Sequence, residues 1–524
     1  MTSTIHRTRR ARRNGSVALP PDLDSPTDRD DSGARGGASS VPTPDGDADV
    51  IDLRDGAGAI AVLEHPVDHP AGPGAASHAD DSSATADGPV ALAAEPVLRP
   101  MAPNAAVTPG RVSAAMHIVL LAATCGVVAW HVAIRGGSLG AGRITIVYSL
   151  VVTAYVLSRF LLAAAYRPPR HAGLEPTVAV IVPAYNEGEA VIRTVHACAA
   201  LDYPASKIEV VCVNDGSSDD TWEHMTAAAR EHPDLVTCID LGENQGKRAA
   251  MAAGIRATDA EILVFVDSDS VPAVDGVRRL VQGFADPKVG AVAGITHVRN
   301  AHRNALTRMQ AARYFVSYEL LKSAESVVGA VACCSGCFSA YRRSALEPLL
   351  ERWEHQRFLG AECTYGDDRS LTNLVIKAGH TTRYDGTAEA WTDSPHTYRK
   401  FLRQQLRWKK SWIREGPLLL GHIWRTRTLA FPFVLVATIA GLLSPVVLLL
   451  NLGVVPAKLG IWPVVYLLGL YLVAVAYGVF YRSRRRDGLW LYAVMGTFFY
   501  IAISVQMLWA VVRVRDGSWG TRGG

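Results

Sequence analysis

Two aspartates that follow a buried apolar run are the first candidates for chemistry. The run Ile262–Asp267 is rich in apolar residues and ends in Asp267, with Asp269 two positions further on. Carboxylates on alternate residues of an extended chain end can hold a hard divalent cation through oxygen ligands. A partly hydrated Mg²⁺ or Mn²⁺ held there can bridge to a diphosphate and neutralise the charge that builds on a departing nucleotide diphosphate.

A second acidic pair, Asp367 and Asp368, follows Gly366 and precedes a predicted helix over Ser370–Ala378. One interpretation is structural, because carboxylates at a helix N-terminus cap it and interact favourably with its dipole. The other makes one of the two a general base that takes a proton from an acceptor hydroxyl. The residues alone leave both interpretations open.

Two further segments carry groups suited to a nucleotide. Asp215, in Asn214-Asp215-Gly216, can accept hydrogen bonds from a base or a ribose, although such a sequence is also a common turn. Lys247 and Arg248 are adjacent cations suited to phosphate oxygens, and their alternative is solvated surface charge.

A basic amphipathic segment lies further along, around Gln404, Arg407 and Trp408. Trp408 offers a flat face of the kind on which sugars stack, and Arg407 offers a forked donor for phosphate. The same pattern is typical of a helix at the level of lipid headgroups. We expect one helix to serve both purposes.

The elements that must position these groups are strands alternating with helices. Val178–Pro183, Ile208–Asn214 and Ile262–Asp267 predict strands, and Asn186–Ala200 predicts a helix. Apolar strands that alternate with helices predict an α/β fold with a doubly wound, mostly parallel sheet. Ligands of such sheets bind beyond the carboxyl ends of the strands, where the acidic residues stand.

Apolar runs on both sides of this region predict a membrane protein. Each approaches the roughly 20 residues that span a bilayer as a helix. Lys and Arg gather after the second run, before the third and after the fourth, which places the intervening polar domain in the cytoplasm. The runs cover residues 114–134, 144–165, 429–452, 461–481 and 488–513.

Composition narrows the remaining possibilities. The net charge of +4 over 524 residues gives no indication of a nucleic-acid partner. The neighbouring Cys333, Cys334 and Cys337 lack a downstream His or Cys pair, so we interpret them as small buried residues and not as zinc ligands. The first 110 residues are rich in Gly, Ala, Ser, Pro and Asp without periodicity, which predicts disorder.

Taken in order, the motifs resemble those of processive family-2 glycosyltransferases. They are P-A-Y-N-E, N-D-G-S-S, G-K-R-A-A, D-S-D-S, S-G-C-F-S-A-Y-R-R, G-D-D-R-S-L-T-N, Q-Q-L-R-W-K-K-S-W-I-R-E and W-G-T-R. The similarity is greatest to hyaluronan synthases, with chitin-oligosaccharide and cellulose synthases more distant, and it runs from Glu175 to Arg522. One departure is Cys337, where hyaluronan synthases often have Pro, and it concerns the acceptor side.

This resemblance implies a GT-A fold, a UDP-sugar donor, Mg²⁺ or Mn²⁺, and an inverting displacement that forms a β-linkage. The resemblance implies UDP-N-acetylglucosamine as a donor, with UDP-glucuronate as a second donor for a hyaluronan-like product, and a growing polysaccharide as the acceptor. Asp215 would contact uridine, Asp269 would be the principal metal ligand with Asp267 beside it, and Lys247 and Arg248 would reach the nucleotide.

The resemblance also implies the remaining roles. Asp368, next to Asp367, would be the catalytic base, and Arg407 would bind the diphosphate. Trp408 and Gln404, with Ser335, Gly336 and Cys337, would face the acceptor at the mouth of a channel. Trp519 and Arg522 would belong to a gating loop that closes over the donor and excludes water.

A cytoplasmic gating loop requires an even number of spans after a cytoplasmic N-terminus, so we interpret 488–513 as an interfacial or re-entrant helix, with a fifth span as the alternative. The protein is then a multi-pass protein of the cell membrane, in contact with lipid. The predicted organisation is a disordered segment (1–110), two transmembrane helices (111–166), a cytoplasmic GT-A domain (171–395), interfacial helices (396–428), two transmembrane helices (429–481), the apolar helix (488–513) and the gating loop (514–524).

Three other functions compete with a hyaluronan-like synthase. The first is a synthase for a chitin-like, poly-N-acetylglucosamine or cellulose-like polymer. The second is a non-processive transferase with a lipid acceptor, which would need neither Gln404–Trp408 nor the W-G-T-R segment. The third is a transporter or scaffold with a degenerate nucleotide-binding domain, and the complete set of acidic motifs argues against it.

Overall fold

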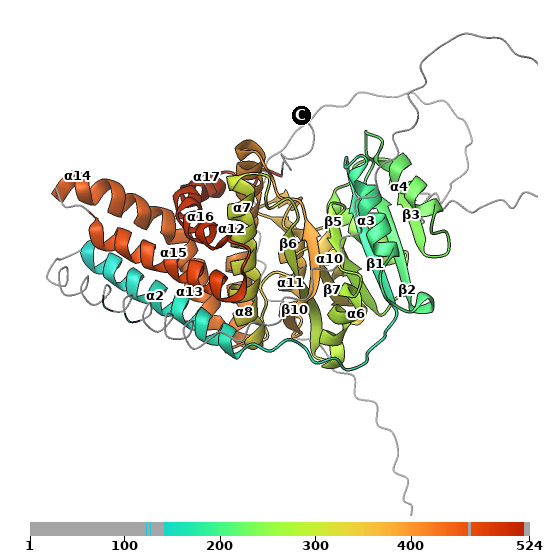
Figure 1. Cartoon of the computed structure of the whole chain (residues 1–524), viewed down its shortest axis with the longest axis horizontal. Coiled ribbons are helices and arrows are strands. Elements are labelled where there is room, and N and C mark those ends of the chain that lie inside the picture. The colour runs from blue at the N-terminus through green and yellow to red at the C-terminus, as the bar shows by residue number, and fades with distance from the viewer. Residues whose placement is uncertain (1–121, 123–125, 127–140, 460–462, 518–524) are drawn as a thin grey trace, which may run out of the picture. The chain divides into compact units, whose positions relative to one another are not determined.

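The structure is a computed structural model that describes residues 122, 126, 141–459 and 463–517 (Figure 1). Its centre is an eight-stranded sheet with the order β3-β2-β1-β4-β7-β6-β10-β5. The first four of these strands are parallel, whereas β7 and β5 run antiparallel to their neighbours. The predicted α/β fold with a mostly parallel sheet is confirmed. The strands are β1 (Val178–Ala184), β2 (Ile208–Asn214), β3 (Val236–Asp240), β4 (Ile262–Phe265), β5 (Ser270–Pro272), β6 (Val289–Val298), β7 (Ser339–Arg342) and β10 (Thr381–Thr392).

Strand β1 shows why the sheet needs helices on both faces. Its residues alternate between two hydrophobic cores, with Val178, Val180 and Val182 in one and Ala179 and Ile181 in the other. All seven of its residues are buried, as the two-residue period of a strand requires when both faces are covered. The first core is shared with α3 (Ala190–Ala199), α4 (Thr221–Arg230) and α6 (Gly276–Leu280), and the second with α5 (Lys247–Arg256), α10 (Leu350–Glu354) and α11 (Asp367–Lys377).

Helix α3 begins later than predicted, at Ala190 instead of Asn186. Asn186 and Gly188 have positive φ angles of 51° and 55°, which a helix cannot contain. The backbone N–H groups of Glu187 and Gly188 both donate to the Thr221 hydroxyl at 2.8 Å. The P-A-Y-N-E motif is therefore a turn held against the start of α4.

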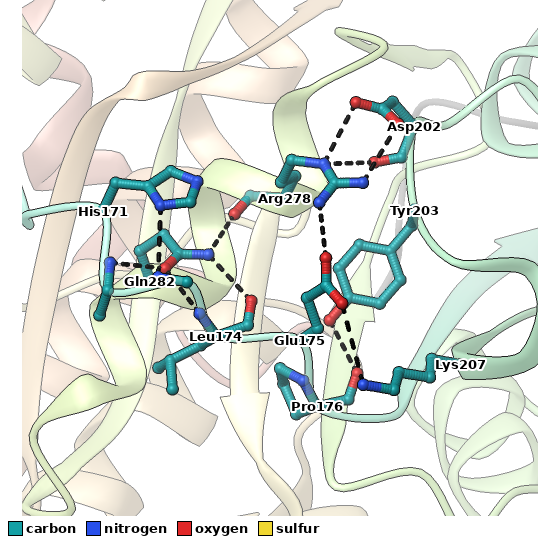
Figure 2. A network of polar contacts seen from close by, with 11 residues as sticks. His171, Leu174, Glu175, Pro176, Asp202, Tyr203, Lys207, Arg278 and Gln282 are labelled. Carbon is teal, nitrogen blue, oxygen red and sulfur yellow. Dashed lines mark hydrogen bonds and ion pairs between the residues drawn. The ribbon is translucent and has the colours of Figure 1, made fainter.

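Helix α2 (Ala141–Ala165) is connected to the sheet by a segment whose last residues, from His171 to Pro176, are held by polar contacts (Figure 2). Gln282 Oε1 accepts from the backbone N–H groups of Ala172 and Leu174 at 2.9 and 3.2 Å. Arg278 pairs with Glu175 at 2.8 Å and with Asp202 at 3.1 Å. These contacts fix where the chain enters β1.

Three helical segments, within the ranges that the structure describes, are long and apolar enough to cross a membrane. They are Phe431–Lys458, Tyr466–Arg484 and Trp490–Val512, and they correspond to the third, fourth and fifth apolar runs. The second run corresponds to α2, and the first, 114–134, lies outside the described residues. The component helices are α13 (Phe431–Leu449), α14 (Val455–Leu459), α15 (Val464–Arg484), α16 (Trp490–Ala502) and α17 (Gln506–Val512).

The last of these segments is interrupted and packs against other helices. A 3₁₀ turn, Ile503–Val505, separates α16 from α17. Helix α16 contacts α15 and α7 (Ala305–Val316), and α17 contacts α12 (Tyr398–Thr426). Lys409 on α12 donates to the Ile503 carbonyl and to Gln506, both at 2.9 Å. The apolar C-terminal helices and the sheet domain are therefore joined through α7 and α12.

We predict that Ile181→Ala lowers the free energy of unfolding by about 2–5 kcal/mol, because Ile181 is fully buried in the second core. Its side chain lies against Gly254, where an added Cβ would come within 2.6 Å of Ile181 Cγ2. Thermal unfolding of the detergent-solubilised protein measures the effect, with the exposed Val274→Ala as the matched control. Equal melting temperatures for the two variants would contradict this packing.

Candidate active site

Asp215 lies at the carboxyl end of β2, inside a loop that wraps around it. Its Oδ1 accepts from the backbone N–H groups of Gln245 and Gly246 at 2.8 and 3.1 Å. Burial raises the pKa of Asp215 to about 6, and these two backbone donors oppose the rise. Gly216, at φ 61°, has no room for a side chain, because a Cβ would lie 2.2 Å from the Glu243 backbone. The N-D-G motif therefore does more than form a turn, because it holds the Asp215 carboxylate in place with two backbone donors.

Asp267 lies just beyond β4 and contacts two groups from different segments. Lys247, the first residue of α5, forms an ion pair with its Oδ1. The Cys337 thiol donates to its Oδ2 at 3.2 Å. Burial alone would lower the pKa of Lys247, but Asp267 and Asp367 raise it above its ordinary value, so the ammonium stays charged. The structure thus brings together the predicted residues Lys247, Asp267 and Cys337.

The loop that carries Cys337 approaches closely because it contains Gly336. A Cβ on Gly336 would lie 3.1 Å from Asp267 Oδ1 and 3.3 Å from Lys247 Nζ. Any larger residue would push these two groups aside. Burial, and then the nearby Asp267, raise the pKa of the Cys337 thiol well above its ordinary value, so the thiol is a neutral donor and adds no negative charge.

Asp269 is oriented by two hydroxyl groups. Its Oδ1 accepts from Ser270 at 3.2 Å and from Thr392, at the end of β10, at 3.1 Å. Within the described residues, no group of three or more His, Cys, Asp or Glu side chains is arranged to hold a metal. The carboxylates of Asp267 and Asp269 are the two groups at this end of the sheet that could hold a hard cation, with its remaining ligands from water and a diphosphate.

Asp368 occupies the first turn of α11, at its positively polarised end. Its Oδ2 accepts from the Cys333 thiol at 3.2 Å, and its Oδ1 from the backbone N–H of Arg369 at 2.7 Å. Burial, and then Asp368, raise the pKa of Cys333, so this thiol also stays protonated. The Asp368 carboxylate is half-buried and held from two sides, in a position to accept a proton from a ligand hydroxyl.

Asp367 and Arg248 form a buried ion pair. The Arg248 Nε donates to Asp367 Oδ1 at 2.7 Å, and both side chains are buried. Arg248 also donates to the Trp353 carbonyl at 2.6 Å, and the Trp353 indole donates to the Asp367 carbonyl at 3.0 Å. In this geometry Arg248 points into the protein. Any effect of Arg248 on a nucleotide, or of Asp367 on catalysis, would therefore act through their chain neighbours Lys247 and Asp368.

The acceptor side contains aromatic residues that the motifs did not reveal. The rings of Trp408 on α12 and Tyr314 on α7 lie 6.3 Å apart, and Tyr318 follows at 6.4 Å from Tyr314. The Tyr318 hydroxyl bonds to the Ser335 hydroxyl at 2.6 Å. The buried Oε1 of Gln404 has no hydrogen-bond partner in the part of the chain that is described. Ser335 and Trp408 are therefore linked by one aromatic stripe, made of Trp408 from α12 and of Tyr314 and Tyr318, which lie four residues apart on α7 and the helical turn that follows it.

The predicted gating residues Trp519 and Arg522 lie outside the described residues. The segment just before them is attached next to Asp367 and Asp368. Tyr365 donates to the Val514 carbonyl, and Lys410 donates to the Asp516 carbonyl at 2.6 Å. A second bond joins Thr364 to the Gly517 carbonyl. Arg407 lies on α12 one residue before Trp408, half-buried.

An α/β sheet with acidic groups at its strand ends, a cation beside them and a positioned carboxylate at the start of α11 is the arrangement of a glycosyltransferase of the GT-A type, and the comparisons with known proteins agree. The profile described as "Glycosyltransferase like family 2" matches residues 176–411. The hyaluronan synthase of Streptococcus pyogenes is 30% identical over 389 residues, which cover 72% of this chain and 90% of that relative. The chain belongs to glycosyltransferase family 2.

Two further similarities agree with this family. An N-acetylglucosaminyltransferase of Azorhizobium caulinodans is 37% identical over 284 residues, covering 53% of this chain and 71% of that relative. A mannosyltransferase from Pyrobaculum calidifontis, solved in complex with GDP-Man and Mn²⁺, matches with a TM-score of 0.50 and 21% identity. It covers 70% of this chain and 98% of its own, and at that identity it supports the fold alone.

We predict that Arg248→Met and Asp367→Leu each lower the free energy of unfolding by about 3–5 kcal/mol, because each leaves an unpaired buried charge. The double variant should recover most of that loss. Thermal unfolding of the four proteins forms a double-mutant cycle, with Arg256→Met as the control for an exposed ion pair. Additive losses in the double variant would show that the pair does not act as a unit.

Proposed function

We propose that this glycosyltransferase is processive, that it polymerises UDP-sugars into a β-linked, hyaluronan-like polysaccharide, and that it exports the product through its own membrane channel. The observation that carries the proposal is the aromatic stripe that begins at the exposed Trp408 on α12 and ends at the buried Tyr318, whose hydroxyl bonds to Ser335. A sugar chain can lie along successive flat faces while its terminal hydroxyl stays at the carboxylate. A transferase with a single-sugar product would not need such a track.

The packing of α12 supports the membrane part of the proposal. This 29-residue helix contacts α11 of the catalytic domain on one side, and α13 and α17 of the apolar helices on the other. Its buried Glu415 accepts from Asn373 on α11 at 2.8 Å. The acceptor platform Trp408 is thus rigidly connected to both parts, with the catalytic domain on the cytoplasmic side as the Lys and Arg pattern predicts.

The same packing supports an interfacial or re-entrant position for Trp490–Val512. Its second half lies along α12, and its end leads to the tail that is attached at Tyr365 and Thr364. A gating loop over the donor requires this tail at the active site. A full span would carry the following residues to the opposite side of the membrane.

In the mechanism, Asp368 removes the proton from the acceptor hydroxyl as that oxygen attacks the anomeric carbon of the donor. The Cys333 thiol and the Arg369 N–H hold the carboxylate in one orientation during this transfer. Asp215 accepts a hydrogen bond from the uracil ring, and Lys247 provides positive charge beside the diphosphate. Asp269 and Asp267 would hold Mg²⁺ or Mn²⁺, which when bound neutralises charge on the leaving UDP.

The relatives support two candidate products that differ in the donors they need. The hyaluronan synthase of Streptococcus pyogenes supports a pair of donors, UDP-N-acetylglucosamine and UDP-glucuronate. The N-acetylglucosaminyltransferase of Azorhizobium caulinodans, with its higher identity over a shorter region, favours a second candidate function, synthesis of a poly-N-acetylglucosamine chain.

We predict that the purified protein releases UDP continuously and makes long polymer only when both UDP-N-acetylglucosamine and UDP-glucuronate are present. The experiment supplies each donor alone and both together, and measures UDP release and product size. Sustained polymer from UDP-N-acetylglucosamine alone would show that the product is a poly-N-acetylglucosamine chain and not a hyaluronan-like polymer. A product of one added sugar would contradict processivity.

We predict that Asp368→Asn reduces polymer formation by at least about 100-fold, in the range of general-base catalysis, because an amide cannot take the proton. UDP binding, measured by calorimetry, should stay within about twofold, since Asp368 does not contact the nucleotide in the proposed arrangement. The exposed variant Asp234→Asn is the matched control. Normal turnover in Asp368→Asn would remove this residue from the base role.

A further inference from the structure

A π-helical turn, η3 (Ser317–Lys322), joins α7 to α8 (Ser323–Val327) next to the active site. Such wide turns are uncommon and occur frequently at functional sites. This one ends in Lys322, whose ammonium lies 4.1 Å from the centre of the Tyr318 ring. Lys322 therefore continues the aromatic stripe that begins at Trp408, and it is the charged end of that stripe.

Lys322 lies on the wall between the donor carboxylates and the predicted base. Its Nζ is 3.4 Å from the Ser335 hydroxyl, two residues before Cys337, which contacts Asp267. The same short segment carries Cys333, which contacts Asp368. A donor sugar attached to a diphosphate at Asp267 and attacked beside Asp368 would lie against this segment, within reach of Lys322.

The charge of Lys322 is retained without an ion-pair partner. Burial alone would lower the pKa of this ammonium, but its pKa is raised by the groups around it, among which Asp368 is the carboxylate. In the residues that the structure describes, no carboxylate lies within 4.0 Å of the Lys322 nitrogen, whereas Lys247 has Asp267. The ammonium is half-buried and contacts the Tyr318 ring and the Ser335 hydroxyl, both uncharged, so an anionic ligand would supply the opposite charge that it lacks.

We propose that Lys322 is a specificity-determining residue that binds the carboxylate of a uronic-acid donor, a nucleoside diphosphate linked to a C6-carboxylated sugar. This proposal rests on the proposed function, because it names the determinant of one of its two donors. The hydroxyls of Ser335 and Tyr318 lie beside the ammonium and bond to each other, so one of their two protons remains to donate to the second carboxylate oxygen.

Electrostatics explains why such a donor needs a dedicated cation. The site already contains the carboxylates of Asp267, Asp269 and Asp368, and a uronate adds a further negative charge to that of the diphosphate. Lys247 is already paired with Asp267. Lys322 offsets the added charge at the sugar end, while an uncharged N-acetylated sugar gains much less from it.

The test compares binding of UDP-glucuronate with that of UDP-glucose, which differs only in having a hydroxymethyl group at C6, and with UDP-N-acetylglucosamine. Titration calorimetry is performed on Asp368→Asn protein, which cannot turn the donors over. Three variants are added in this background: Lys322→Met, Lys322→Arg and, as a matched control, the distant and exposed Lys207→Met. Melting temperatures verify that each variant is folded.

We expect Lys322→Met to weaken UDP-glucuronate binding at least about tenfold, the scale of a lost charge-assisted hydrogen bond. Binding of the two uncharged donors should change less than about twofold, Lys322→Arg should keep much of the preference for the uronate, and Lys207→Met should resemble the parent protein. An equal loss for all three donors would assign Lys322 a structural role and overturn the proposal. No preference for UDP-glucuronate over UDP-glucose in the parent protein would overturn it as well.

The two proposals fail in different ways. Sustained polymer from UDP-N-acetylglucosamine alone in the wild-type protein would reject the hyaluronan-like product, whatever the binding data show. A uronate preference that is unaffected by Lys322→Met would reject only the role of Lys322 and leave the product open to both donors.

Discussion

The buried ion pair between Arg248 and Asp367 determines the spacing of the whole site. Arg248 is the second residue of α5 and Asp367 the first of α11, and the pair joins these two helix starts at 2.7 Å. Their neighbours are Lys247, which pairs with Asp267 and is proposed to lie at the donor diphosphate, and Asp368, which is proposed to act on the acceptor. Separating the helices would leave two buried charges unpaired, so this distance is stiff. The proposed donor site at Lys247 and the proposed base Asp368 are thereby held at a fixed separation. The ion pair that holds them is formed by two other residues, Arg248 and Asp367.

The second constraint is the balance of charge around the reacting sugar. Asp267, Asp269 and Asp368 would repel a diphosphate if nothing opposed them, and in the proposed mechanism Lys247, Lys322 and a bound divalent cation would provide the opposing charge. The thiols of Cys333 and Cys337 orient two of the carboxylates while remaining neutral, because burial raises their pKa values. A hydroxyl would orient a carboxylate in the same way, whereas an amine would change the net charge of the site.

The catalytic domain and the apolar helices share their hydrophobic packing. Ala312 and Phe315 of α7 lie in one cluster with Ala163 of α2, Phe480 of α15 and Ala493 of α16. The face of α7 that carries Tyr314 and continues to Tyr318 borders the active site. In the proposed function, a sugar chain moving along this stripe would pass from Asp368 to the helices proposed to form the channel.

Much of the fold and part of the site could be predicted from local sequence. Strands β1, β2 and β4 are apolar runs followed closely by polar residues. The motifs after β2 and β4 were enough to predict Asp215, Asp267 and Asp269 as site residues. The start of α3 was wrong by four residues, because the positive φ angles of Asn186 and Gly188 depend on the hydroxyl of Thr221, which lies far along the chain. The antiparallel direction of strands β5 and β7 also depends on partner strands that are distant in sequence.

The sequence by itself determined the class of chemistry, since carboxylates after buried strands and a basic aromatic helix require only residue type and order. It also determined the apolar segments, because a length of about 20 residues is a local property. Only the tertiary structure decided that Arg248 turns inward to Asp367, that Cys333 holds Asp368, and that Tyr314, Tyr318 and Lys322 line the site. These roles depend on side chains brought together from distant segments, and pairing of that kind leaves no periodic signal in one chain.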